Sequence, residues 1–322
     1  MMGWTDRHAR YFLRLITKHS LLYTEMVNTG ALLHNRQKVG SQKRLLAYHA
    51  AEHPVALQLG GSDPQALAQC AVMVEDAGFD EVNLNVGCPS DRVKSGNFGA
   101  CLMAQPELVA ESVAAMKAKV AIPVTVKCRI GIDDMAEYAS LHHFINVVAQ
   151  GGCESFIVHA RKAWLQGLSP KQNREIPPLK YDYVHRLKKE KPALNISING
   201  GIKSIKSVQQ QLLHVDGVMI GREAYNNPYM LASVDQRIYL DADAPIKSRE
   251  EIVLQMCDYI DAELARGTNL HSMTRHILGL YQGVRGAKAW RRYLSENAHV
   301  DGADSAVVRA ALNCVTDQQP DV

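Results

Sequence analysis

The 322-residue sequence lacks several features that mark special classes of protein. No uninterrupted apolar run approaches the ~18 residues of a membrane span. The first residues, MMGWTDRHARYF, carry charges and have no apolar core of the kind found in secretory signal peptides. The seven cysteines are odd in number and never form a C-x-x-C pair, which argues against a disulfide framework and against a zinc site. We therefore expect a cytoplasmic protein with reduced thiols, without a membrane or a metal.

Acidic residues are missing from two stretches of a chain whose net charge is only +3. The chain as a whole is therefore no polycation. However, residues 264–295 contain no Asp or Glu, and neither do residues 155–173. The basic residues in and directly after these stretches are Arg161, Lys162, Lys171, Arg174, Arg266, Arg275, Arg285, Lys288, Arg291 and Arg292. Basic residues clustered in a nearly neutral protein indicate an anionic partner that meets particular faces.

Short β-rich runs alternate with helical patterns over the first 220 residues. We predict strands at residues 22–26, 55–59, 82–86, 124–129, 156–159, 195–199 and 217–220. We predict helices between them at residues 64–77, 106–119, 135–150, 181–189 and 204–214. Repeated strand–helix units indicate a parallel sheet, and this regularity favours an α/β fold of the (β/α)₈, or TIM-barrel, type.

The eighth strand of such a barrel has no counterpart in the sequence. A helical pattern at residues 6–18 precedes the first recognisable strand, whereas a barrel chain normally begins with a strand. Met1 and Met2 therefore resemble the end of a first strand whose beginning is absent, and we expect an N-terminal truncation.

The pattern changes after residue 244. Residues 249–266, 272–282, 287–297 and 305–316 read as successive helices without strands between them. We therefore predict a barrel domain at residues 1–244 and a helical domain at residues 245–322. Trp290 and Leu294 form a packing stripe four residues apart. Three basic residues, here called the helical basic cluster, are predicted on another face: Lys288, Arg291 and Arg292.

Chemically rich residues stand where the predicted strands end, and in (β/α)₈ enzymes function lies at these ends. They are Gln58, Asn85 with Cys88, Lys127 with Arg129, His159 with Arg161, Asn199-Gly200-Gly201 and Gly221-Arg222. Any one of them alone would more often be a structural polar residue. The loops after the last two strands of such barrels often bind phosphate. Here these loops contain glycine, which lets main-chain N–H groups approach an anion closely. Arg222 would add a bidentate charge, and a phosphorylated cofactor is the natural occupant.

Seven motifs in this order resemble the tRNA-dihydrouridine synthases, particularly their A subfamily. They are TEMV, ALQLGG, NLNVGCPSDRV, VKCRIG, HARKAWLQGLSPKQNREIPPL, INGGI and GREAYNNP, followed by GVRGAKAWRRYLSE in the helical domain. The resemblance covers essentially the whole chain. It implies a flavin-binding barrel, tightly bound FMN recharged by NADPH, and reduction of uridine in the tRNA D-loop, at positions 20 and 20a.

The resemblance also implies roles for individual residues. Cys88 is then the general acid that protonates C5 of the uracil ring. The residues expected to bind FMN are Met1, Met2, Gln58, Lys127, His159, Asn199, Gly200, Gly201, Gly221 and Arg222. Those expected to bind the tRNA are Asn85 at the base, and Lys171, Arg174 and the helical basic cluster at phosphates. We expect the enzyme to act as a monomer.

Three alternatives remain open from the sequence. Lys127 could be the Schiff-base lysine of a class I aldolase. The chain could also be an RNA-binding relative whose barrel has lost catalysis. Among flavin barrels, a dihydroorotate or enoate reductase fits less well, since neither needs a basic helical domain.

Overall fold

The computed structural model describes residues 1–34, 44–90 and 96–315, and the chain divides into two compact units. The sheet unit consists of Tyr23–Tyr48 and His53–Ile220. The helical unit consists of Met1–Leu22, His49–Glu52 and Gly221–Val322. These bounds differ from the predicted domains because residues 1–22, 49–52 and 221–244 group with the C-terminal helices. A functional division at residues 244 and 245 stays a prediction.

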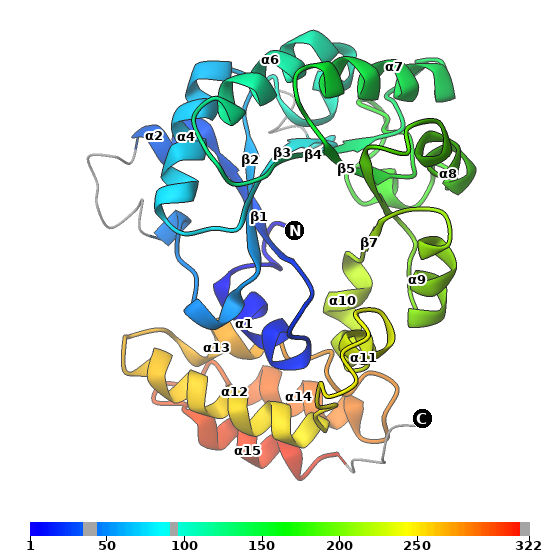
Figure 1. The fold of residues 1–322 in the computed structure, drawn as a ribbon. Helices are drawn as coiled ribbons and strands as arrows, with labels where there is room; N and C mark the ends of the chain where they lie inside the picture. Colours follow the sequence, from blue (N-terminus) through cyan, green and yellow to red (C-terminus); the bar gives the residue numbers. More distant parts are fainter. Residues whose placement is uncertain (35–43, 91–95, 316–322) are drawn as a thin grey trace. The chain divides into compact units, whose positions relative to one another are not determined.

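A seven-stranded sheet forms the centre of the sheet unit, with its strands in sequence order (Figure 1). The strands are β1 (Leu22–Asn28), β2 (Val55–Gly60), β3 (Glu81–Val86), β4 (Val124–Arg129), β5 (Ser155–His159), β6 (Asn195–Asn199) and β7 (Gly217–Met219). From β2 to β7 each strand pairs in parallel with the next. The seven predicted strands and the α/β barrel-type fold are thereby confirmed.

Helices connect the strands, and Figure 1 shows them ranged outside the sheet. They are α2 (Thr29–His34), α4 (Pro64–Asp76), η3 (Gly99–Ala104), α6 (Pro106–Lys117), α7 (Glu137–Gln150), η4 (Gln172–Arg174), α8 (Tyr181–Glu190) and α9 (Ile205–Leu212). The first residues of α4 explain why a helix can be predicted here from the sequence. Asp63 Oδ1 accepts a hydrogen bond from Ala66 N at 2.8 Å, and Pro64 occupies the first helical position, where no N–H is needed.

The strands are largely buried, but their two faces differ in polarity. Leu57, Leu84 and Val126 are fully buried, as expected for parallel strands covered by helices. The register places Gln58 opposite Asn83, and Asn83 opposite Thr125. Nearer the strand ends, Arg129 stands opposite His159, and His159 opposite Asn199. Polar side chains therefore share one face of the sheet and continue to its C-terminal edge.

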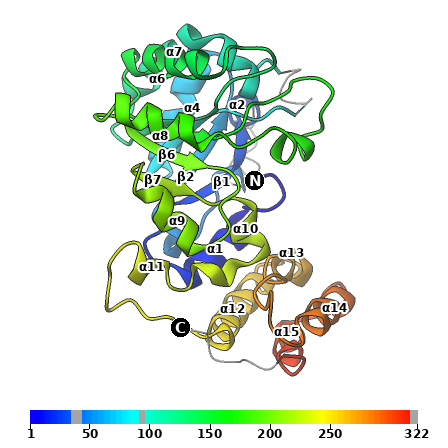
Figure 2. The same ribbon diagram turned by 90° about the vertical axis from the view of Figure 1, so that its right-hand side faces the viewer.

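The helical unit is built from short helices around an apolar core. They are α1 (Arg7–Ile16), η2 (Ala50–Glu52), α10 (Arg222–Asn226), η5 (Pro228–Leu231), α11 (Val234–Arg237), α12 (Arg249–Leu264), α13 (Leu270–Thr274), α14 (Ala287–Asn297) and α15 (Ser305–Leu312). Helix α12 begins with a capping box between Ser248 and Glu251. Helices α12, α14 and α15 pack together (Figure 2). Trp290 and Leu294 are buried in this core, so the predicted packing stripe is confirmed.

The predicted helix at residues 272–282 is wrong. Helix α13 ends at Thr274, and turns closed by hydrogen bonds between residues three apart follow it. Gly279 lies against the main chain of residues 225 and 226, and a Cβ at this position would stand 2.6 Å from Asn226 O. Ile277 and Leu280 are fully buried. The segment therefore follows tertiary packing and not its helical periodicity.

Two structural features are absent from the described residues. None of the helices in residues 1–34, 44–90 and 96–315 combines the length and apolar character needed to cross a bilayer. Within the same ranges, no three His, Cys, Asp or Glu side chains come together as metal ligands would.

Candidate active site

The loop that carries Cys88 is held at three points directly after β3. Asn85 Oδ1 accepts hydrogen bonds from the main-chain N–H groups of Gly87 and Cys88, both at 3.0 Å. Arg129 Nε donates to Gly87 O at 3.0 Å. Cys88 O accepts from Ala100 N at 2.9 Å. Cys88 itself is partly exposed, and its thiol donates a hydrogen bond to Ser90 Oγ at 3.4 Å. Part of the same motif, residues 91–95, lies outside the described residues.

Two cations lie on β4 beside this loop. Lys127 stands opposite Asn85 in the register of β3 and β4. Burial is the main cause that lowers the pKa of Lys127 from 10.5 to about 8, and the neighbouring charge of Arg129 adds to it. Arg129 is buried, and burial lowers its pKa to about 10. Both groups stay mostly protonated near neutral pH and make this edge of the sheet electropositive.

Gln58 and Asn85 use part of their hydrogen-bonding capacity on each other. Asn85 Nδ2 donates to Gln58 Oε1 at 2.7 Å, and Gln58 Nε2 donates to Asn83 Oδ1 at 2.8 Å. An amide group has two donor hydrogens and two acceptor lone pairs. Asn85 therefore has its acceptor capacity filled by the loop and retains one N–H for a further partner. Gln58 retains one N–H and one lone pair.

The Asn199-Gly200-Gly201 loop packs directly against His159. Both glycines have positive φ, +114° and +71°. A Cβ on Gly200 would stand 2.6 Å from His159 Cδ2, and one on Gly201 would stand 2.6 Å from Leu179 Cδ1. Asn199 Nδ2 donates to Met219 O at 2.7 Å, which joins the ends of β6 and β7. The structure thus brings the predicted residues His159, Asn199, Gly200 and Gly201 together.

The long loop after β5 is organised around Asn173, which is fully buried. Its amide donates to Trp164 O and Leu168 O, and its Oδ1 accepts from Trp164 N. Arg129 Nη1 donates to Asn173 O at 2.9 Å, so this loop and the Cys88 loop share one guanidinium. Lys171 and Arg174 lie on either side of Asn173 and are exposed.

The remaining predicted cofactor residues belong to the helical unit. Gly221 immediately precedes α10, and Arg222 is its first residue. Met1 lies beside them, because a Cβ on Gly221 would stand 3.8 Å from its sulfur. Met2 is more exposed, at 60%. The structure therefore groups Met1, Gly221 and Arg222 within this unit.

The helical basic cluster lies on the outer side of α14, opposite the buried Trp290. Lys288 and Arg292 are exposed, and Arg292 makes only a loose contact of 4.0 Å with Glu296. Arg291 Nη1 donates to Gln282 Oε1 at 3.3 Å. Arg291 also lines a cavity of about 420 Å³ within the helical unit, together with Glu223, Tyr225, Asn226, Asn227, Arg275, Leu278, Gly279 and Gln282. Its lining thus combines two arginines with one carboxylate and several hydrogen-bonding side chains.

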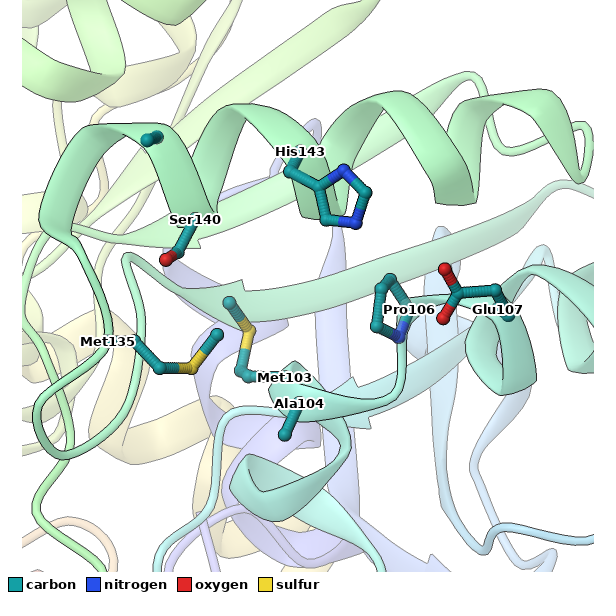
Figure 3. Close-up of a pocket in the computed structure, with 8 residues that line it drawn as sticks. Met103, Ala104, Pro106, Glu107, Met135, Ser140 and His143 are labelled. Carbon is teal, nitrogen blue, oxygen red and sulfur yellow. The ribbon is translucent and has the colours of Figure 1, made fainter.

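A second cavity of about 420 Å³ lies beside α7 (Figure 3). Its lining consists of Met103, Ala104, Pro106, Glu107, Met135, Ala139, Ser140 and His143. It contains none of the residues predicted for flavin, uridine or phosphate. The chemistry of the strand ends, and not this cavity, therefore defines the candidate site.

Sequence reasoning missed several residues that shape the site. Glu81, Asn83 and Thr125 are buried and hydrogen-bonded to one another beneath Gln58 and Asn85. Arg129 was noted at a strand end but received no role. A signal was present, since Glu81, Asn83 and Asn85 alternate along one strand and thus share one face. The sequence could not show which partners this face would meet.

The side chains at the strand ends fit a flavin nucleotide. Lys127, Gln58 and His159 supply donors for the polar edge and developing negative charge of a flavin ring. Gly200 and Gly201 leave main-chain N–H groups without shielding Cβ atoms, which suits a phosphate.

Comparisons with known proteins agree with this chemistry. A family described as "Dihydrouridine synthase (Dus)" matches residues 1–316. A curated tRNA-dihydrouridine(20/20a) synthase of Shewanella oneidensis is 60% identical over 315 residues, covering 98% of this chain and 92% of that protein. The protein of the same name from Escherichia coli K12 is 58% identical over 320 residues, covering 99% of this chain and 91% of that protein.

Solved structures with little sequence similarity share the fold. A complex of 2-naphthoyl-CoA reductase matches with a TM-score of 0.55 and 11% identity, over 73% of this chain and 47% of that one. Morphinone reductase matches with a TM-score of 0.51 and 12% identity, over 72% of this chain and 81% of that one.

Proposed function

The chain belongs to the dihydrouridine synthase family, and from this premise we propose that it reduces uridine to 5,6-dihydrouridine at positions 20 and 20a of the tRNA D-loop. The observation that carries this proposal is the 58–60% identity, over nearly the whole chain, with curated tRNA-dihydrouridine(20/20a) synthases. The protein acts in the cytoplasm as a monomer and uses FMN as its bound cofactor and NADPH as its reductant.

The chain's own residues supply distinct parts of the flavin site. Lys127 places an ammonium against the ring edge that becomes negative on reduction. Gln58 offers its remaining N–H and lone pair to the polar edge of the ring. In the sheet unit, Asn199, Gly200 and Gly201 would hold the phosphate, and His159 would reach the flavin or its phosphate side. In the helical unit, Gly221 and Arg222 are proposed phosphate-binding residues, and Met1 and Met2 are proposed to lie under the flavin ring. Reduced FMN, when bound, supplies a hydride to C6 of the uracil ring.

Cys88 completes the reduction by donating its thiol proton to C5. The S–H group of a protonated cysteine is the donor that this step needs. The three anchors of the Cys88 loop hold the thiol in one place, and Asn85 points its remaining N–H toward a partner. Since both acceptor sites of Asn85 are filled, it contacts a uracil carbonyl as a donor.

A uridine stacked inside folded tRNA cannot meet a flavin, so the base has to leave its stack before reaction. Lys171 and Arg174 on the loop after β5, and the helical basic cluster on α14, bind the phosphates around it. Family membership speaks against the alternative in which Lys127 forms a Schiff base, and borohydride trapping of a substrate on Lys127 would revive it.

The test compares two cysteine variants on an unmodified tRNA transcript with NADPH. The wild-type protein is expected to bind FMN and to form dihydrouridine at positions 20 and 20a. Cys88→Ala should keep its FMN and its oxidation of NADPH but form almost no dihydrouridine, because the thiol serves only the uracil half-reaction. Cys101→Ala is the matched control, since its thiol donates to Phe98 O at 3.1 Å in nearby η3. Normal dihydrouridine formation by Cys88→Ala would refute the assignment of the proton donor.

A further inference from the structure

A chain of side-chain hydrogen bonds runs from the beginning of β3 to the Cys88 loop. Glu81 Oε1 accepts from Thr125 Oγ1 at 2.7 Å, and Thr125 Oγ1 accepts from Asn83 Nδ2 at 2.8 Å. Asn83 Oδ1 accepts from Gln58 Nε2 at 2.8 Å, and Gln58 Oε1 accepts from Asn85 Nδ2 at 2.7 Å. Glu81 and Asn85 are four residues apart on one strand, so this relay spans about 13 Å.

The groups at the two ends of the relay fix which atoms donate and which accept along it, and both ends require the same assignment. At one end, the N–H groups of Gly87 and Cys88 can only donate, so Asn85 must turn its carbonyl oxygen toward them. At the other end, an ionised carboxylate can only accept, so the Thr125 hydroxyl must donate to Glu81. Each amide between them then has a single orientation that satisfies its neighbours. Reversing any one amide would place two donors or two acceptors in contact.

The buried carboxyl group of Glu81 would cost folding free energy if its role were purely structural. It is 9% exposed, and none of the ion pairs in the described part of the chain includes it. Its other hydrogen bond comes from Tyr23 OH at 2.7 Å. Burial raises the pKa of the Glu81 carboxyl, which is the physical sign of this unfavourable setting. A buried carboxylate without a cation costs free energy that an apolar side chain of similar size would not.

We propose that Glu81 is a positioning residue for Cys88, acting through Thr125, Asn83, Gln58 and Asn85. The relay holds the amide of Asn85 in the one orientation that accepts from the Cys88 loop and presents an N–H to the base. The relay explains why three polar residues occupy the buried part of the sheet. The expected effect of the relay on dihydrouridine formation rests on the proposed function. Its expected effect on the Cys88 main chain does not.

The test breaks the relay in the middle with Thr125→Val, which keeps the shape of the side chain but removes the hydroxyl. Thr125→Ser is the rescue variant because it keeps the hydroxyl. Val113→Ala, a buried site on α6 away from the relay, controls for a general loss of stability. The FMN-loaded proteins are labelled with ¹⁵N-cysteine, and amide exchange is read at Cys88, with Cys128 in β4 as the internal reference.

Thr125→Val should raise exchange of the Cys88 amide about tenfold while that of Cys128 changes little, and Thr125→Ser should restore it. With tRNA, kcat for dihydrouridine formation should fall at least tenfold at unchanged KM, because a small misplacement of a reacting group is costly. The rate of flavin reduction by NADPH should not change. If Thr125→Val does not fold, Asn83→Ala replaces it with the same expectations.

Three outcomes would overturn the relay: unchanged Cys88 exchange in Thr125→Val, equal increases at Cys88 and Cys128, or the same pattern in Val113→Ala. A wild-type protein that forms no dihydrouridine would instead refute the proposed function. In that case, the exchange comparison would still decide whether the relay positions Cys88.

Discussion

Replacing Lys127 with methionine should stabilise the flavin-free protein while weakening flavin binding. Lys127 is only partly exposed, and burial and Arg129 lower its pKa from 10.5 to about 8. Since one pKa unit corresponds to ~1.4 kcal/mol, keeping this ammonium charged in the folded chain costs up to about 3 kcal/mol. The partial exposure reduces that cost, so we expect a gain of about 1–3 kcal/mol at neutral pH. Methionine has a similar length and carries no charge.

The pH dependence of this gain follows from the direction of the pKa shift. Below about pH 8 the folded and unfolded chains both hold the proton on Lys127, so the full cost is present. Between pH 8 and 10.5 the unfolded chain binds more protons than the folded chain, and the stability of the wild-type protein rises with pH. Above pH 10.5 both states are neutral and the cost is gone. The difference between variant and wild type should therefore shrink as pH rises through this window.

Urea unfolding of the flavin-free proteins at a series of pH values measures this difference, and repeating it with excess FMN measures the lost flavin binding. Lys203→Met is the matched control, because Lys203 is an exposed lysine of the same sheet unit. It should change stability by less than about 0.5 kcal/mol. Equal stability of Lys127→Met and wild type at neutral pH, or a difference that grows with pH, would refute the reasoning.

Three further predictions concern two loops and the helical basic cluster proposed to bind tRNA. Gly200→Ala should lower FMN affinity at least tenfold by displacing His159, whereas Gly167→Ala, which also has positive φ but no atom within 4 Å of the added Cβ, should leave flavin binding intact. Replacing the helical basic cluster with alanines should weaken tRNA binding at constant flavin content, with the log–log salt slope reduced by roughly one per lost contact; an unchanged slope would place the tRNA elsewhere. Arg129→Lys should cost about 1–3 kcal/mol in urea unfolding, since its planar guanidinium donates to three main-chain carbonyls that a single ammonium cannot reach together. Unaltered stability would contradict that role.

Much of the fold could be predicted because the strands are buried on both faces. Runs such as residues 124–129 are short, alternate apolar with polar residues and are bounded by loop residues, and the structure places β4 at Val124–Arg129. The segment at residues 272–282 could not be predicted in the same way. Its periodicity is helical, but Gly279 has to approach the main chain of residues 225 and 226, and that contact is invisible in the sequence.

The amino-acid sequence alone is sufficient to identify the chemical groups of the candidate site. Cys88, Lys127 and His159 stand at the ends of recognisable strands, and local patterns are sufficient to place such residues at one edge of a parallel sheet. The contacts that support these residues, in contrast, become visible in the folded chain alone. Arg129 joins two loops, and Glu81 reaches the Cys88 loop through partners on neighbouring strands. These contacts depend on strand register, and a slip of one residue would turn every one of these side chains to the other face.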